Sequence, residues 1–274
     1  MKKYHLELFS GTHSFGKISK KYNYEVISLD RDLKGKCPFS DYDNSKNHIQ
    51  EDIMTWDYKN YPIQNFELIT ASPVCLWWSS LRNSWIGRKC KSIHPTEIIT
   101  KELIEKDIEK YGKPMVDKVI EIIEYFKPKY WIIENPQTGK MKNYISCQYP
   151  KYDIYNDFSY CKFSDWGYEK KTRFWNNIKG LENKLCKKDC ENIISFNNQK
   201  IHKERMGNSH KTIIDNGKII RVNTKELREK YKDYENIKIV ESKQKKYNIC
   251  KGTKKLERYR IPEKLITYFF NNMV

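Results

Sequence analysis

The chain has 274 residues, a length that fits one large α/β domain with or without a small appended lobe. Its 52 Lys and Arg residues against 35 Asp and Glu give a formal net charge of +17, which indicates a polyanionic partner, usually nucleic acid, although codon bias can also enrich lysine. No apolar run approaches ~18 residues, and a signal peptide and a disulfide framework are not apparent, so we expect an intracellular protein that does not span a membrane.

Strand-like apolar runs alternate with helix or turn signals along the first part of the chain. The predicted strands, in chain order, are His5–Phe9, Tyr24–Asp30, a weaker one that ends at Asp52-Ile53, Phe66–Ala71 and Tyr130–Glu134. Apolar residues at helical spacing predict a helix over Met115–Phe126. This alternation is typical of a mostly parallel, doubly wound α/β sheet, in which ligands bind at the carboxyl ends of the strands.

Two polar segments interrupt or follow these elements. Residues 76–113 are long for a connector and include a predicted helix, Thr96–Tyr111, so they form either a lid over a site or a surface insertion. Residues 178–250 are lysine-rich and weakly periodic, which predicts a small irregular lobe. The chain then closes with a predicted apolar helix, Glu263–Phe270, that we expect to pack on the sheet.

A loop with small residues follows the first predicted strand. Phe9-Ser10-Gly11-Thr12 would let a ligand approach backbone N–H groups at the start of a helix. Asp30 ends the second predicted strand, the position from which a carboxylate accepts hydrogen bonds from ribose hydroxyls. The pair favours a nucleoside-type cofactor over a plain strand–helix turn.

A thiol and a carboxylate end two neighbouring predicted strands. Cys75 follows Ser72-Pro73 after the fourth strand, and Glu134 ends the fifth. A buried structural cysteine is the common alternative, since free cysteine often behaves as a small hydrophobe. The pairing of the two groups at the ligand edge of the sheet favours nucleophilic catalysis with acid assistance.

These motifs occur in an order that resembles the DNA cytosine-5 methyltransferase family, in the style of its small phage and large-virus members. The motifs are Phe9-Ser10-Gly11, Asp30, Asp52-Ile53, Ser72-Pro73-Val74-Cys75, Glu134-Asn135-Pro136 and Lys171-Thr172-Arg173. Val74 stands where the family usually has a second proline, and Pro136 where it favours valine. The resemblance implies a Rossmann-like class I methyltransferase fold with a mostly parallel seven-stranded sheet and a small irregular C-terminal lobe.

The resemblance also implies a mechanism and a cofactor. Cys75 would add to carbon 6 of a flipped-out cytosine, Glu134 would act at N3, and Arg173 would hold the base. Trp77 and Trp78 would either replace the base in its stack or pack as core residues. The residues implied to surround S-adenosylmethionine are Phe9, Ser10, Gly11, Thr12, Asp30, Asp52, Ile53, Ser72 and Pro73.

The division of the chain follows from these assignments. We expect residues 1–177 to form the catalytic domain, 178–254 a small lobe in the place of a target-recognition region, and 255–274 a C-terminal helix that returns to the catalytic domain. Within the lobe, a structural zinc site is one possibility, with the ligands Cys186, Cys190, His202 and His210. The segment Met206-Gly207-Asn208-Ser209 resembles a piece that closes the cofactor pocket in the family, which competes with the zinc interpretation.

The predicted function is therefore methylation of carbon 5 of cytosine in DNA with S-adenosylmethionine. The same chemistry on RNA is one alternative, and a nucleic-acid-binding relative without turnover is another. The joint presence of Cys75, Glu134 and Arg173 favours an active enzyme. The target sequence and the oligomeric state do not follow from the sequence.

Overall fold

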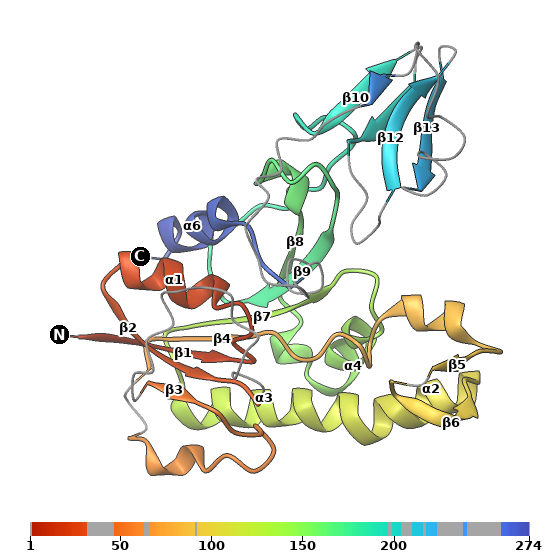
Figure 1. Ribbon diagram of the computed structural model, residues 1–274. Coiled ribbons are helices and arrows are strands. Elements are labelled where there is room, and N and C mark those ends of the chain that lie inside the picture. The colour runs from red at the N-terminus through yellow and green to blue at the C-terminus, as the bar shows by residue number, and fades with distance from the viewer. Residues whose placement is uncertain are drawn as a thin grey trace.

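A seven-stranded sheet runs through the centre of the computed structural model, with the strand order β3-β2-β1-β4-β7-β9-β8 (Figure 1). Its strands are β1 (Lys3–Leu8), β2 (Tyr24–Leu29), β3 (His48–Ile49), β4 (Leu68–Ala71), β7 (Tyr130–Pro136), β8 (Tyr155–Ser159) and β9 (Lys171–Asn176). Neighbouring strands from β3 to β7 are parallel, and only β9 is antiparallel to its neighbours β7 and β8. The predicted α/β class with a mostly parallel seven-stranded sheet is confirmed.

The structure describes residues 2–31, 47–62, 66–90, 92–196, 199–203, 210–215, 218–223, 238–239 and 259–273. Among these residues, no helix is long and apolar enough to cross a membrane.

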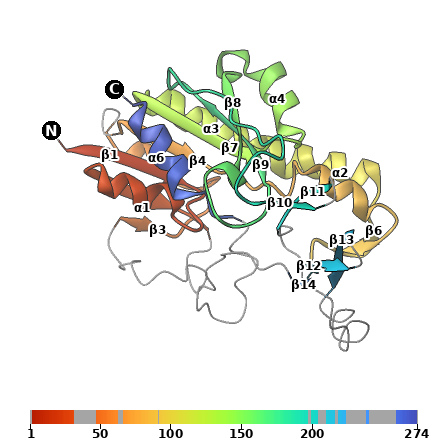
Figure 2. The same ribbon diagram turned by 90° about the horizontal axis from the view of Figure 1, so that it is seen from above.

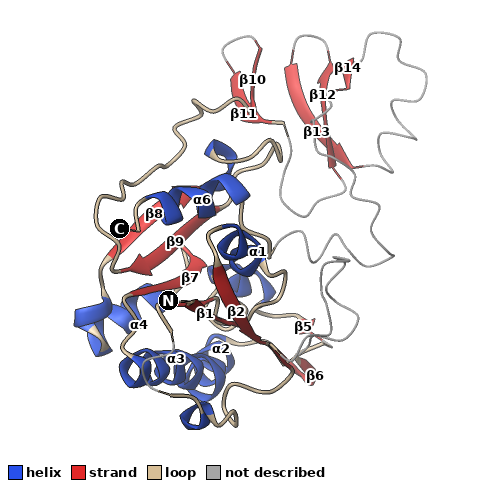
Figure 3. Ribbon diagram, turned by 90° about the vertical axis from the view of Figure 1, so that its left-hand side faces the viewer, coloured by secondary structure: helices blue, strands red, loops and turns tan. Residues whose placement is uncertain are grey.

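Helices cover both faces of the sheet, as Figure 3 shows. One face carries α1 (Ser14–Lys21) and α6 (Glu263–Asn271), and the other carries α3 (Lys113–Phe126) and α4 (Met141–Gln148). The short 3-10 helical turns in the described part of the chain are η1 (Tyr58–Asn60), η2 (Ser80–Trp85), η4 (Pro150–Tyr152) and η5 (Tyr160–Lys162). The sheet is therefore the middle of three layers, and both of its faces are buried.

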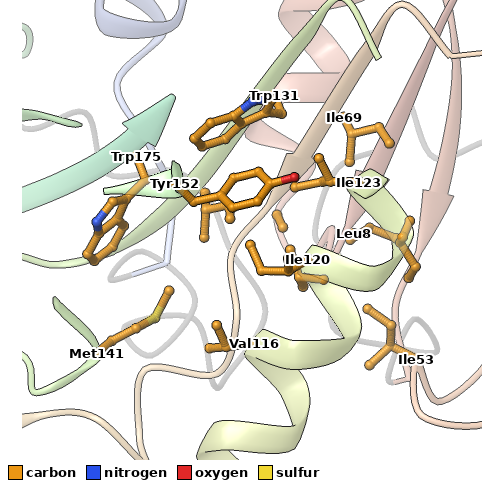
Figure 4. Close-up of a cluster of buried hydrophobic side chains, with 14 of the residues drawn as sticks. Leu8, Ile53, Ile69, Val116, Ile120, Ile123, Trp131, Met141, Tyr152 and Trp175 are labelled. Atoms are coloured by element: carbon orange, nitrogen blue, oxygen red, sulfur yellow. The ribbon is translucent and has the colours of Figure 1, made fainter. Parts of the chain in front are cut away.

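Each face of the sheet has its own hydrophobic core. Between the sheet and α3, side chains such as Leu8, Ile69, Ile120 and Ile123 converge (Figure 4). On the other face, α6 supplies Phe269, whose ring lies 5.1 Å from that of Phe174 and 6.1 Å from that of Phe15. Burial of each such side chain stabilises the fold by roughly 1.5–3 kcal/mol. The closing helix thus packs back on the sheet, although it comes from the far end of the chain.

The segment between β4 and β7 departs from the prediction. Residues 94–98 belong to a hairpin formed by β5 (Lys89–Cys90) and β6 (His94–Ile98), so the predicted helix over Thr96–Tyr111 begins too early. Helix α2 (Lys101–Asp107) starts only after Thr100, whose hydroxyl accepts a hydrogen bond from the amide of Leu103 at 3.1 Å. A π-helical turn, η3 (Ile108–Gly112), then joins α2 to α3 without a break, which Figure 2 shows from above.

The predicted irregular lobe contains regular strands. Strands β10 (Ile193–Phe196) and β11 (Gln199–His202) form one antiparallel pair. A second sheet pairs β12 (His210–Asp215) with β13 (Lys218–Asn223) and β14 (Lys238–Ile239). These small sheets lie beyond β8 and β9, apart from the central sheet (Figure 1). Weak periodicity in the sequence concealed them, since short strands with little buried surface leave little hydrophobic alternation.

Candidate active site

The loop from β1 to α1 contains three residues with left-handed backbone. Phe9, Gly11 and His13 have φ angles of 53°, 44° and 50°, a conformation that is unfavourable for residues other than glycine. The amide of Gly11 donates a hydrogen bond to Asp30 Oδ2 at 2.9 Å. Parallel pairing of β1 with β2 thus brings together the glycine loop and the carboxylate that the sequence suggested as a cofactor site.

Small polar side chains line this loop. Ser10 Oγ is buried and has no hydrogen-bond partner among the residues that the structure describes. Thr12, which is also buried, shares a hydrogen bond of 2.9 Å with Ser14. A buried hydroxyl that makes no hydrogen bond costs roughly 1–3 kcal/mol. A polar ligand that reached Ser10 would remove that cost, so the loop fits a nucleoside-type cofactor.

Buried contacts of Glu7 with His13 and Gly16 hold this loop in place. Glu7 Oε2 lies 2.9 Å from His13 Nδ1, and Glu7 Oε1 accepts a hydrogen bond from the amide of Gly16 at 3.0 Å. Burial opposes ionisation of Glu7, but the hydrogen bond and charge of His13 outweigh it, so the pKa of Glu7 is lowered. The carboxylate therefore ties the strained loop to the first turn of α1.

Asp52 and Ile53 follow β3 at the same edge of the sheet. Asp52 Oδ1 accepts a hydrogen bond from the amide of Met54 at 3.0 Å, and Asp52 Oδ2 lies 3.6 Å from Arg31. Ile53 is 4% exposed and belongs to the main core (Figure 4). Asp52 thus caps a turn in this structure, and its side chain remains partly exposed at the edge where the predicted cofactor residues gather.

The loop after β4 carries the candidate nucleophile. Ser72 continues the sheet with a hydrogen bond to Leu8, and Asn135 Nδ2 donates to the carbonyl of Pro73 at 2.9 Å. The carbonyl of Cys75 then accepts the amides of Trp78 and Ser79 at 3.2 and 2.9 Å. These bonds hold the thiol at the carboxyl ends of β4 and β7. Asn135 belongs to a motif noted in the sequence, but its contact with the nucleophile loop was not predicted.

Cys75, Glu134 and Lys170 form the charged centre of the site. Burial and the negative charge of Glu134 raise the pKa of the Cys75 thiol, while Lys170 opposes that rise. Lys170 Nζ lies 3.7 Å from Glu134 Oε1, and Tyr160 contacts the same oxygen at 3.4 Å. Glu134 itself is only 8% exposed. Sequence reasoning missed Lys170, although it directly precedes the motif that contains Arg173.

Arg173, which the resemblance implied would hold the base, pairs with Asp157 in this structure. Register pairs Arg173 with Asn135 and Phe174 with Glu134, and successive residues of a strand point to opposite faces, so Arg173 does not share the face of Glu134. Its guanidinium forms two hydrogen bonds to Asp157, at 2.8 and 2.9 Å. The cation beside Glu134 in this structure is therefore Lys170.

Residues 76–113 are anchored to the body of the protein by buried polar and aromatic contacts. Arg82 and Asp107, both almost fully buried, form an ion pair. Trp78 is 2% exposed and stacks on Tyr144, so it is a core residue. Trp77 is only partly buried and stacks on Tyr111 with ring centroids 4.7 Å apart.

The predicted metal ligands lie in a second cluster. Cys186, Cys190 and His202 come together with Cys161, which the sequence did not single out because it lies in a distant segment. His210 begins β12, but its side chain lies outside the described residues, as does the segment Met206–Ser209. The structure thus gathers three of the four predicted ligands and adds a cysteine.

Comparisons with known proteins place the chain among methyltransferases. It is 38% identical over 192 residues to "Probable DNA (cytosine-5)-methyltransferase" of Frog virus 3 (isolate Goorha), which covers 69% of this chain and 78% of the relative. Two similar solved structures are the Dnmt2 methyltransferase of S. pombe (16% identity, TM-score 0.43) and a putative DNA modification methyltransferase of an E. coli prophage (14%, 0.37).

The matches to these solved structures cover 66% and 64% of this chain, and the chain spans 53% and 46% of theirs, about half of their length. No protein-family model matches the chain. The assignment therefore depends on the viral relative, whose identity and coverage are both high. The chain belongs to the DNA (cytosine-5)-methyltransferase family.

Proposed function

We propose that this protein methylates carbon 5 of cytosine in DNA, with Cys75 as the covalent nucleophile and Glu134 as the acid. The observation that carries the proposal is the placement of a thiol and a largely buried carboxylate at the ends of adjacent parallel strands, beside Lys170. The site lies at the edge of the sheet where the cofactor loop also ends. The viral relative, named for this activity on DNA, supports the substrate.

The residues of the loop after β1 would bind S-adenosylmethionine, which supplies an electrophilic methyl group. Ser10 offers a buried hydroxyl that makes no bond within the described chain, and Gly11 offers a backbone conformation suited to close approach. Asp30 would accept hydrogen bonds from ribose hydroxyls, and Asp52 from the adenine amino group. Phe9, Thr12, Ile53, Ser72 and Pro73 complete the proposed set.

The chemical steps assign a distinct role to each catalytic group. The thiolate of Cys75 adds to carbon 6 of cytosine while Glu134, which must first take up a proton, gives that proton or a hydrogen bond to N3, which makes carbon 5 nucleophilic. After carbon 5 has gained its methyl group, it loses its proton to solvent, the Cys75–carbon 6 bond breaks, and N3 returns any proton it received to Glu134. The ring and the thiolate are restored, and the net change is one methyl group gained by carbon 5 and one proton released.

Lys170 enters the proposal as the group that favours the thiolate. Burial and Glu134 both disfavour a negative charge on Cys75, and Lys170 is the nearby cation that counters them. Arg173 would act indirectly. Its ion pair with Asp157 joins β8 to β9 and so supports the strand next to Glu134. A direct contact between Arg173 and the base would require Arg173 to leave Asp157.

The rest of the chain would bind the nucleic acid. The net charge of +17 suits a phosphate backbone, and the strands of residues 178–254 extend beyond the catalytic body, where a target-recognition region would reach the duplex (Figure 1). Extrusion of the base into the site would let Cys75 reach carbon 6. Residues 1–177 with the returning helix would then form the catalytic unit.

The test measures methyl transfer from labelled S-adenosylmethionine to separate DNA and RNA pools. We expect 5-methylcytosine in the DNA pool, and its loss in Cys75→Ala. Cys147→Ala is the matched control, since Cys147 is an exposed free cysteine on α4, and it should keep full activity. A DNA oligonucleotide that contains 5-fluorocytosine should trap a covalent adduct with wild type and not with Cys75→Ala.

Label in RNA alone would show that the substrate is RNA and would leave the proposed chemistry unchanged. No label and no adduct in either pool, with cofactor binding retained, would refute the enzymatic proposal and favour a binding protein.

A further inference from the structure

A second group of reactive side chains lies outside the candidate active site. Cys161, Cys186, Cys190 and His202 place their sulfur and nitrogen atoms within 4.8 Å of one another. They come from three separate segments: the turn η5 after β8, the loop between β9 and β10, and strand β11. Four ligand atoms from three segments meet at one point, which local turn geometry cannot explain.

Two distances within the group match a tetrahedral metal site. Nε2 of His202 lies 3.6 Å from Cys186 Sγ and 3.5 Å from Cys190 Sγ. With Zn–S of about 2.3 Å and Zn–N of about 2.05 Å, a tetrahedral centre requires N···S of roughly 3.5 Å. A single hydrogen bond from the imidazole would serve one sulfur, whereas this nitrogen is equally close to two.

Hydrogen bonds from neighbouring residues hold the ligand segments in place. The amide of Cys186 donates to Ser159 Oγ at 3.0 Å, which joins the loop to the end of β8. Asn192, which is 4% exposed, donates to the carbonyl of Cys161 at 2.8 Å. Supporting contacts of this kind orient the ligands of metal sites.

A disulfide explains the cluster less well than a metal does. All six cysteines in the described part of the chain are free, and three of them belong to this group. One disulfide would leave one thiol and the histidine without a role. Three thiolates and one imidazole form a common ligand set of structural zinc, and the spacing of Cys186 and Cys190 falls within its usual range.

We propose that Cys161, Cys186, Cys190 and His202 bind one Zn²⁺ ion that fastens the lobe to the catalytic body. Cys161 lies directly after Tyr160, whose hydroxyl contacts Glu134. The ion would thus connect the strands β10 and β11 to the turn that borders the active site. This inference does not depend on the methyltransferase activity.

The first measurement is the metal content of the full chain, purified without a polyhistidine tag. We expect about one Zn²⁺ per chain. Replacement by Co²⁺ should give the intense visible bands of a tetrahedral site and a sulfur-to-metal charge-transfer band in the near ultraviolet. Removal of the ion with a chelator should lower the melting temperature, and added Zn²⁺ should restore it. These results come from wild type and hold whether or not a variant folds.

Variants then test the ligand set. Cys161→Ser and His202→Asn should lose zinc, whereas Cys147→Ser, an exposed cysteine outside the cluster, should keep it. Absence of zinc from wild type, even after reconstitution with ZnCl₂, would overturn the proposal. If Cys161→Ser kept its full zinc content and His210→Ala lost zinc, this ligand set would be overturned in favour of one that includes His210.

Discussion

Protonation of His5 should weaken the fold below neutral pH. His5 lies in β1 and is fully buried, with Nδ1 2.9 Å from Ser19 Oγ on α1 and Nε2 2.8 Å from Thr70 Oγ1 on β4. Both ring nitrogens are thus engaged by hydroxyls that suit a neutral imidazole. Burial lowers the pKa of His5 to about 4 from an ordinary value of 6.5.

Acid should lower the stability of the fold because the unfolded state binds a proton at His5 more readily than the folded state does. Between about pH 6.5 and about pH 4, the unfolded chain binds a proton at His5 that the folded chain does not, so acid favours unfolding. From about pH 7.5 to about pH 5, this linkage removes about 2 kcal/mol from the free energy of unfolding. Other groups titrate in the same range, so a comparison with a variant isolates His5.

The assay is urea unfolding of wild type and His5→Gln at both pH values. The loss of stability between them should be about 2 kcal/mol smaller in the variant, provided circular dichroism shows that the variant is folded near neutral pH. Titration of the His5 ring by NMR in wild type gives an independent measure. Equal losses in the two proteins, or a ring that titrates near pH 6.5, would refute the reasoning.

Three further substitutions test the site and its supports. Lys170→Met should raise the pKa of Cys75 further, so that alkylation of the thiol by iodoacetamide requires a higher pH. Methyl transfer should fall at least about tenfold. An unchanged pH profile of alkylation would contradict this prediction. Gly16→Ala puts a Cβ 2.6 Å from Glu7 Oε2, so cofactor affinity measured by calorimetry should drop. An unchanged affinity would show that the loop does not depend on this carboxylate. Asp107→Ala breaks the buried ion pair with Arg82 and should cost roughly 3–5 kcal/mol of unfolding free energy in urea; a loss below about 1 kcal/mol would show that the pair is not buried in solution.

The sequence alone determined the layers of the fold and the edge at which the site lies. Apolar runs of strand length and their alternation with helical spacing are local properties, so β1, β2, β4 and β7 were predicted close to their true bounds. Parallel strands with connecting helices must align their carboxyl ends. The approach of Gly11 to Asp30, and of Cys75 to Glu134, follows from that rule.

Boundaries that depend on competition between local and tertiary contacts were less predictable. The apolar and polar residues before α2 also fit a helix, but residues 94–98 pair with β5, and in this conformation His94 reaches the buried carboxylate of Asp107 at 2.8 Å. The π-helical turn before α3 ends at Gly112. A Cβ there would lie 3.1 Å from Trp78, so the close approach of the two segments favours glycine at this position.

Only the tertiary structure decided which side chains lie near Cys75 and Glu134. Strand β9 runs antiparallel to β7, and its register decides which face each residue takes; a shift of one residue would bring Arg173 onto the face of Glu134. The group of Cys161 with Cys186, Cys190 and His202 was hidden for a related reason, since its members are brought together by the packing of distant segments. Periodicity and spacing depend on residues that are close in the chain, so they predict local structure. Register and long-range packing are determined only when the whole sheet forms.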